Sequence, residues 1–121
     1  MIKEKNFFEA EFSGGLLAVR VLGEIDHHSA LNLRQGIDGL IAEKRPERLI
    51  LDLSRVDFMD SSGLGLILGR YAEVKKIGGD MVVINPNKNV MKILKLAGAE
   101  RMIKIEKVDL DRKKDLDGKE R

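Results

Sequence analysis

The fold is decided by the run Leu49-Ile50-Leu51-Asp52-Leu53 and by the stretch that follows it, Val56-Asp57-Phe58-Met59-Asp60-Ser61-Ser62-Gly63-Leu64-Gly65. The first run is almost continuously apolar, as expected of a strand that is buried on both faces. Apolar residues then recur at helical spacing, at Leu64, Ile67, Leu68 and Tyr71. The polar residues between the two runs therefore lie where a helix opens, and the first backbone N–H groups of a helix have no partner within it.

The composition indicates one globular domain with an aliphatic core. The chain has 121 residues, of which 43% are hydrophobic and only 4% aromatic, and this is enough for a single core. It contains no cysteine, which excludes disulfides, thiol nucleophiles and cysteine-based metal sites. Its 22 basic and 20 acidic residues give a formal charge of +2, a balance that does not indicate a nucleic-acid surface.

No segment of the sequence has the character of a membrane anchor or a secretion signal. The N-terminus lacks an apolar stretch of signal type, and no run approaches the roughly 18 apolar residues of a membrane span. We therefore expect a cytoplasmic protein that binds neither nucleic acid nor membrane. We also expect no cofactor, and a monomer when the protein is free.

Upstream of the central stretch, the pattern predicts a hairpin and then a helix. Residues 7–12 and 16–22 read as two strands, and Gly14-Gly15 between them is a turn dipeptide. The helix that follows has Asp26 or Ser29 as its candidate cap. Its apolar stripe consists of Ala30, Leu33, Ile37, Leu40 and Ile41.

Downstream, helices and strands alternate. We predict a helix over 62–77 that ends at Gly78-Gly79, a strand over 81–84, a short helix capped by Asn87 and closed by Gly98, and a strand over 101–105. The fold class is therefore α/β, with a mixed, mostly parallel sheet, an N-terminal antiparallel hairpin and helices packed on the sheet. Residues 1–106 form the domain. Eleven of the fifteen residues in 107–121 are charged, which predicts a tail that is a frayed helix or disordered.

Ser61 and Ser62 allow two interpretations. In the first, one of them or Asp60 simply caps the helix, a contribution of about 1 kcal/mol. In the second, a serine is phosphorylated: a phosphate adds about −1.5 to −2 charges at a helix end that tolerates an anion. Because Asp57 and Asp60 already make this patch acidic, phosphorylation would sharpen a repulsion, and its result would be lost affinity for a partner.

Three glycines bear on this choice. Gly63, Gly65 and Gly69 lie in or beside the same helix, where each glycine is costly. They indicate that something approaches this face closely, either the neighbouring strand or a partner protein.

The second notable cluster is Glu24-Ile25-Asp26-His27-His28. Two adjacent histidines and two acids suggest a metal site, but neighbouring side chains on a helix point in different directions and no further ligand has a recognisable spacing. We therefore favour an exposed helix start. Loops at the carboxyl ends of strands gather at one edge of an α/β sheet, so 24–28 and 57–63, with 85–88 as a candidate third part, are expected to share one surface.

Enzyme-like alternatives have less support. A phospho-aspartate receiver would use Asp52 with Glu24 and Asp26 around magnesium and Lys104 as its basic partner, but the N-terminal hairpin does not fit that fold. The serines lack the Gly-x-Ser-x-Gly elbow of a hydrolase. Gly63-Leu64-Gly65 lacks the pattern of a phosphate-binding loop.

Three motifs together resemble a known family, the bacterial anti-sigma factor antagonists of the STAS domain class. The motifs are Gly23-Glu24-Ile25-Asp26-His27-His28, Phe58-Met59-Asp60-Ser61-Ser62-Gly63-Leu64-Gly65 and Leu68-Gly69-Arg70-Tyr71. The resemblance runs from about residue 7 to 106, and the charged end at 107–121 departs from the more amphipathic final helix of the family. The paired histidines are most similar to the sporulation branch, the stage II antagonists in the sigma-F pathway. An antagonist in a general stress-response pathway is the alternative.

The resemblance implies a non-enzymatic switch. The unphosphorylated antagonist binds a nucleotide-loaded partner that is both anti-sigma factor and serine kinase, and so frees the sigma factor. Phosphorylation of the first serine after the Asp, here Ser61, abolishes binding, and a serine phosphatase restores it. We expect the partner-binding surface to consist of Glu24, Asp26, His27, Asp60, Ser61, Ser62, Gly63 and Gly65.

Overall fold

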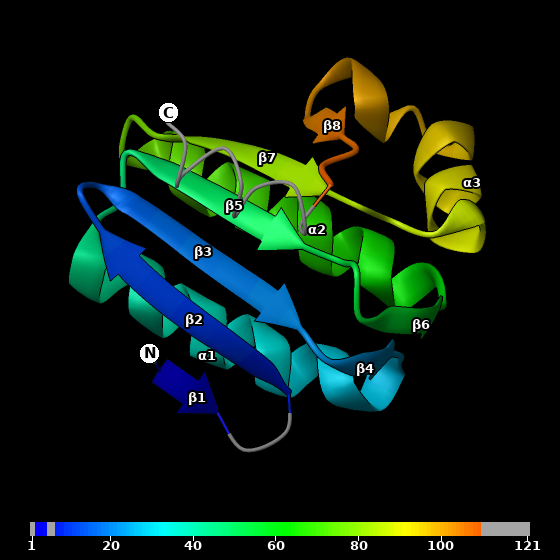
Figure 1. The fold of residues 1–121 in the computed structure, drawn as a ribbon, viewed down its shortest axis with the longest axis horizontal. Coiled ribbons are helices and arrows are strands. Elements are labelled where there is room, and N and C mark those ends of the chain that lie inside the picture. The colour runs from blue at the N-terminus through cyan, green and yellow to red at the C-terminus, as the bar shows by residue number, and fades with distance from the viewer. Residues whose placement is uncertain (1, 5–6, 110–121) are drawn as a thin grey trace.

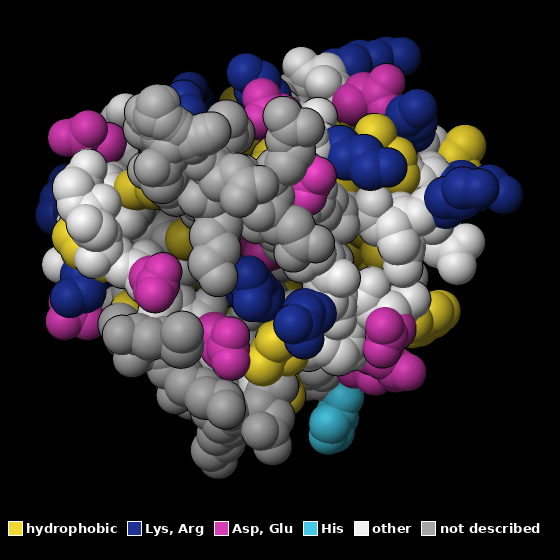
Figure 2. Space-filling view, in the orientation of Figure 1, with side chains coloured by type: hydrophobic (Ala, Val, Ile, Leu, Met, Phe, Trp, Pro, Cys, Tyr) yellow, Lys and Arg dark blue, Asp and Glu magenta, His cyan; other side chains and the backbone are white. Residues whose placement is uncertain are grey.

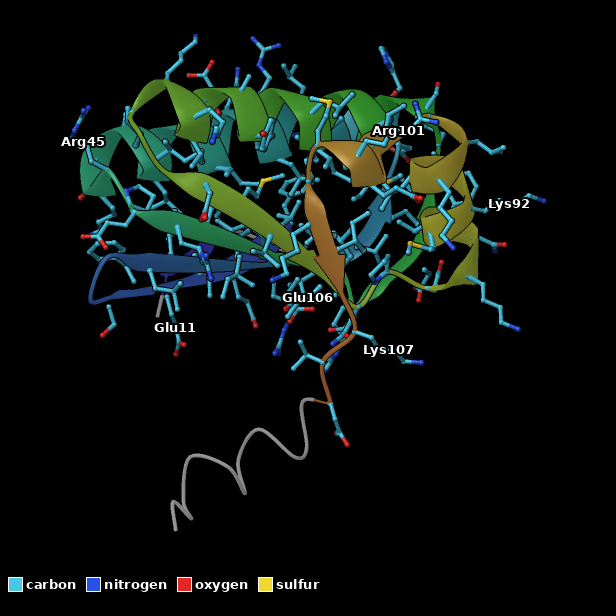
Figure 3. All side chains as sticks on the ribbon, turned by 90° about the horizontal axis from the view of Figure 1, so that it is seen from above. Glu11, Arg45, Lys92, Arg101, Glu106 and Lys107 are labelled. Atoms are coloured by element: carbon cyan, nitrogen blue, oxygen red, sulfur yellow. The ribbon has the colours of Figure 1, made fainter. Side chains whose placement is uncertain are left out.

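The computed structural model describes residues 2–4 and 7–109, with side chains from residue 7 onward. The strands of its main sheet are β1 (Ile2–Glu4), β2 (Phe8–Ser13), β3 (Leu16–Val21), β5 (Arg48–Asp52), β7 (Asp80–Ile84) and β8 (Lys104–Glu106). They are hydrogen-bonded in the order β1-β2-β3-β5-β7-β8. The helices α1 (His27–Lys44) and α2 (Ser61–Lys76) both cover one face of this sheet (Figures 1 and 3).

The sheet is antiparallel on its N-terminal side and parallel elsewhere. Both β1 and β3 pair antiparallel with β2, whereas β3-β5, β5-β7 and β7-β8 are parallel pairs. The hairpin between β2 and β3 turns at Gly14 and Gly15, whose φ angles of 58° and 81° favour glycine. The predicted α/β class, with its mixed sheet and N-terminal hairpin, is confirmed. The edge strand β1 is an addition that the sequence analysis did not predict.

The core lies between the sheet and the two helices and is aliphatic, as the composition predicts. Leu49 and Leu51 of β5 and Ile37 of α1 are completely buried in it. Ile50 points to the opposite face of the sheet, where it is half-buried because no described helix covers that face. The expectation that this strand is buried on both faces is therefore wrong for Ile50. Figure 2 views this side of the molecule, on which basic and acidic side chains are interspersed.

Each of the three α-helices begins at a side-chain cap. Asp26 caps α1, Asp60 caps α2, and Asn87 caps α3 (Lys88–Leu96). The predicted caps Asp26 and Asn87 are thereby confirmed. Gly78 after α2 and Gly98 after α3 have φ angles of 84° and 75°, as expected of glycines that follow helices. None of the described helices is long and apolar enough to cross a membrane.

Two short strands outside the main sheet were not predicted from the sequence. They are β4 (Gly23–Ile25) and β6 (Val56–Met59), which pair in parallel and form a sheet of their own. Residues 23–25 lie beyond the strand predicted over 16–22 and form a separate strand, because Gly23, with a φ of 82°, turns the chain. Both strands lie beyond the carboxyl ends of β3 and β5, at the right in Figure 1.

The C-terminal part of the domain differs slightly from expectation. The strand predicted over 101–105 starts only at Lys104, because a 3-10 turn occupies Ala99–Arg101. After β8, the backbone N–H of Val108 donates to Oδ1 of Asn85 at 2.7 Å. The predicted charged tail over 107–121 lies, from residue 110 onward, outside the described residues.

Candidate functional site

The two short strands bring two helix starts together. Ile25 of β4 is the register partner of Met59 of β6, and the backbone N–H of Asp60 donates to the carbonyl of Ile25 at 3.0 Å. Asp26 and Asp60 each follow directly after their strand, so the two caps lie side by side. The expectation that 24–28 and 57–63 share one surface is confirmed by this pairing.

Asp26 holds the first turn of α1. Its carboxylate accepts the backbone N–H groups of His28 and Ser29, both at 2.9 Å, and the Ser29 hydroxyl accepts the N–H of Asp26 at 3.1 Å. This reciprocal arrangement is a capping box. The backbone N–H of Ser29, followed by that of His28, lowers the pKa of Asp26 below its ordinary value of 3.8. The carboxylate is therefore charged at neutral pH.

Ser61 is the first residue of α2, and it is exposed. The capping is done by the preceding residue, because Oδ1 of Asp60 accepts the N–H of Ser62 at 2.8 Å. No residue in the described part of the chain hydrogen-bonds to the Ser61 hydroxyl. The capping interpretation thus applies to Asp60, and the Ser61 oxygen stands in solvent.

The other residues of the expected partner-binding surface differ in exposure. Glu24, His27 and Gly65 are exposed, and Ser62 is half-buried. Gly63 is buried, so it supports the surface from beneath rather than forming part of its exterior.

The glycines of α2 fall into two groups. A Cβ at Gly63 would collide with the side chain of Met59, so the neighbouring strand β6 explains this glycine. A Cβ at Gly65 or Gly69 would meet nothing within 4 Å. Both lie on the same stripe of the helix as Ser61, because residues four apart are stacked one above the other. Packing within the domain therefore accounts for Gly63 alone.

The competing interpretations of the acidic residues find no matching geometry. Asp52, the candidate phospho-aspartate, is buried at the end of β5, and its Oδ2 lies 3.0 Å from Nε of Arg20. No group of three or more His, Cys, Asp and Glu residues suited to a metal ion occurs in the described part of the chain. The acids do not assemble the cation site that a receiver needs.

Two exposed apolar residues near the helix starts were not predicted. Phe58 of β6 is 49% exposed, and Leu31 in the second turn of α1 is 55% exposed. Strict alternation along β6, counted from the buried Val56, would place Phe58 inside. The exposure of Phe58 therefore has no signal in the sequence.

The predicted site residues lie outside the groove beside α3. A groove of about 1340 Å³ lies between α3 and residues 105–109, and none of the predicted site residues lines it. Its walls combine apolar residues such as Met91 and Leu96 with lysines of α3, one of which, Lys92, points outward in Figure 3. The exposed position of Ser61, outside this groove, suits contact with a macromolecule better than enclosure of a small substrate.

The two capped helix starts on a mixed sheet belong to a recognised class of domain. The family model described as "STAS domain" matches residues 7–111. The chain belongs to the STAS domain family. This confirms the family expected from the three sequence motifs.

Relatives of known name are anti-sigma factor antagonists. The chain is 40% identical over 97 residues to the anti-sigma F factor antagonist of Paenibacillus polymyxa, and the match covers 80% of this chain and 83% of that protein. It is 33% identical over 89 residues to the anti-sigma-B factor antagonist of Bacillus subtilis (strain 168), covering 74% of this chain and 80% of that protein.

The fold is that of solved antagonists as well. The anti-sigma factor antagonist SpoIIAA in its unphosphorylated form superimposes with a TM-score of 0.75 at 29% identity, covering 89% of this chain and 93% of that chain. The Bacillus cell fate determinant SpoIIAA in its phosphorylated form gives a TM-score of 0.70 at 28% identity, covering 89% and 96%.

Proposed function

We propose that the protein is an anti-anti-sigma factor whose phosphoacceptor is Ser61. In this proposal the unphosphorylated form binds a nucleotide-loaded anti-sigma factor that is also a serine kinase, and the bound sigma factor is released. The observation that carries the proposal is the exposed Ser61 hydroxyl, which lies directly after the cap Asp60 and is not used by the fold. The names of the relatives supply the class of partner.

Charge explains how phosphorylation would switch binding off. Asp60 and Asp26 lie side by side at the two helix starts, and the exposed Glu24 and Asp57 are on the paired strands β4 and β6. A phosphate on Ser61 adds about −1.5 to −2 charges to this acidic group. The N-terminus of α2 tolerates the anion locally, whereas a partner that packs on the neutral hydroxyl meets both new charge and new bulk. A serine phosphatase would restore the binding form.

Two branches of the family remain to be distinguished. We favour the sporulation branch, in which the partner is an anti-sigma-F factor, because the adjacent His27 and His28 are typical of it and because the anti-sigma F relative has the higher identity of the two. The alternative is a general stress-response pathway with an anti-sigma-B type of partner. Competition between the two purified anti-sigma factors for this protein distinguishes the branches.

Phosphosite mapping tests the proposal. The purified protein is incubated with the anti-sigma kinase and ATP, and the product is analysed by mass spectrometry. We expect one phosphate on Ser61, full labelling of Ser62→Ala and no labelling of Ser61→Ala. Labelling that persists in Ser61→Ala, or that maps to Ser62, contradicts the assignment. Circular dichroism of both variants provides the folding control.

A further inference from the structure

One side chain outside the expected partner-binding surface touches the strand that leads to Ser61. Nδ2 of Asn87 donates to the carbonyl of Val56 at 3.2 Å and to the carbonyl of Asp57 at 3.2 Å. Oδ1 of the same side chain accepts the N–H of Val90 at 2.9 Å and so caps α3. A single amide therefore joins the start of α3 to two successive residues of β6.

The strand that Asn87 contacts is anchored in the core by Val56 and Met59, but its strand pairing is short. β6 has four residues and pairs with a strand of three, and their register shifts between Gly23 and Ile25. Two-stranded sheets of this size are marginally stable by themselves. The chain passes from β6 directly into Asp60 and Ser61, so any loosening of β6 also loosens the candidate phosphoacceptor.

Asn87 is itself held firmly. The turn that contains it follows β7, and its first residue, Asn85, has a φ of 56° and accepts the N–H of Val108 at 2.7 Å. The backbone N–H of Asn85 also donates to the carbonyl of Glu106 at 2.9 Å. The turn is thus hydrogen-bonded to the end of β8 and the residues after it on one side, and to β6 on the other.

We propose that Asn87 is a positioning residue for Ser61. Its Nδ2 fixes β6 and thereby holds Asp60 and Ser61 in the geometry that a kinase or an anti-sigma factor recognises. The expected effect on phosphorylation and binding rests on the proposed function, whereas the hydrogen bonds from Asn87 to β6 do not.

The substitution Asn87→Asp separates two roles of this side chain: the Nδ2 hydrogen bonds to β6 and the Oδ1 cap of α3. Asp keeps an acceptor for the N–H of Val90 and is as good a helix cap as Asn. It replaces the donor by a carboxylate oxygen, which faces two carbonyls instead of binding them. Asn85→Asp is the matched control, because it adds the same charge to the same turn, retains an acceptor for Val108 and suits the left-handed conformation.

Three measurements are made on the full chain: the melting temperature, hydrogen exchange of the β6 amides, and kcat and KM for phosphorylation by the anti-sigma kinase. We expect Asn87→Asp to melt at a lower temperature, because its two hydrogen bonds to β6 are lost. We also expect it to exchange the β6 amides faster and to lose about fivefold in kcat/KM. Asn85→Asp should match the wild type in all three. A role confined to capping α3 would leave the exchange of β6 unchanged.

Unchanged exchange of β6 in Asn87→Asp overturns the proposal, whatever the kinetics. Faster exchange with unchanged kcat/KM also overturns it, because the hydrogen bonds from Asn87 would then not position Ser61. If the wild type is not phosphorylated at all, the proposed function fails, and the exchange measurement alone decides whether Asn87 fixes β6.

Discussion

Asp26 and Asp60 are the N-caps of two different helices, and they lie side by side because the N–H of Asp60 donates to the carbonyl of Ile25 at 3.0 Å. Residues separated by more than thirty positions in the sequence therefore form one acidic surface. The two aspartates make the capping hydrogen bonds at this surface. The Ser61 hydroxyl is therefore not needed for capping and is accessible to a partner or a modifying enzyme.

The first prediction concerns charge at Ser61. Ser61→Asp should weaken binding to the anti-sigma factor by about 1–3 kcal/mol, because a fixed carboxylate joins the acidic surface of Asp26 and Asp60. Ser61→Asn has nearly the same size without the charge, so it separates repulsion from bulk. Titration calorimetry measures both affinities. Equal affinities for the Asp and Asn variants would show that bulk, rather than charge, switches binding off.

The second prediction concerns the glycines of α2. Gly65→Ala and Gly69→Ala should each stabilise the protein by about 1 kcal/mol, since the added methyl group meets nothing and Ala is the better helix former. Gly63→Ala should destabilise by about 1–3 kcal/mol, because it overpacks against Met59. Urea denaturation gives all three values. If a partner packs closely on the Ser61 stripe, Gly65→Ala binds more weakly although it is more stable.

The third prediction concerns the ion pair between α1 and α2. Nε of Arg70 lies 2.7 Å from Oδ1 of Asp38 without hydrogen-bond alignment, and the Arg70 side chain is only 6% exposed. Asp38→Asn leaves the buried Arg70 charge without its partner and should cost about 1–3 kcal/mol, less than for a fully buried pair because the Asp38 side chain is 35% exposed. The double variant Asp38→Leu/Arg70→Met should recover most of that loss. Denaturant unfolding of the single and double variants provides the comparison. A double variant as unstable as Asp38→Asn would contradict this account.

The fourth prediction concerns acid stability. Folding lowers the pKa of Asp26 below 3.8, so the cap stabilises the folded state above that pH, and the contribution is lost as the pH falls through the lower, folded value. Asp26→Asn should keep stability at pH 7, because Asn also caps helices. Its stability should then depend less on pH below about 4. Thermal unfolding between pH 7 and pH 2 measures this, and Asp57→Asn is the control for loss of a nearby charge outside a cap.

The main elements of the fold follow from local patterns in the sequence. Gly14-Gly15 marks the hairpin, and Asp26 and Asn87 mark two helix starts, because caps and turns depend on interactions among neighbours in the chain. The strands β4 and β6 could not be predicted in this way. They have three and four residues, too few for a periodic pattern, and they exist because distant segments pair.

The sequence indicates candidate residues for the site but not the contacts that hold them in place. The polar residues of 57–63 identify the helix start, and the family resemblance indicates which serine to test. The expected grouping of 85–88 with 57–63 places the turn of Asn87 near β6, but neither source indicates the hydrogen bonds from its side chain or the exposure of Phe58. These features depend on the irregular pairing of β6 with β4 and on its contact with the turn before α3, which only the tertiary structure defines. The glycines were ambiguous for the same reason, and the structure assigns only Gly63 to internal packing.

A last consequence follows from Asp60, rather than Ser61, providing the cap. Because no described residue hydrogen-bonds to that hydroxyl, the proposed phosphorylation of Ser61 and its reversal should hardly change the unfolding midpoint. The proposed phosphoacceptor oxygen makes no hydrogen bond within the described part of the fold. Under the proposed function, one folded molecule could therefore pass through many cycles of phosphorylation and dephosphorylation.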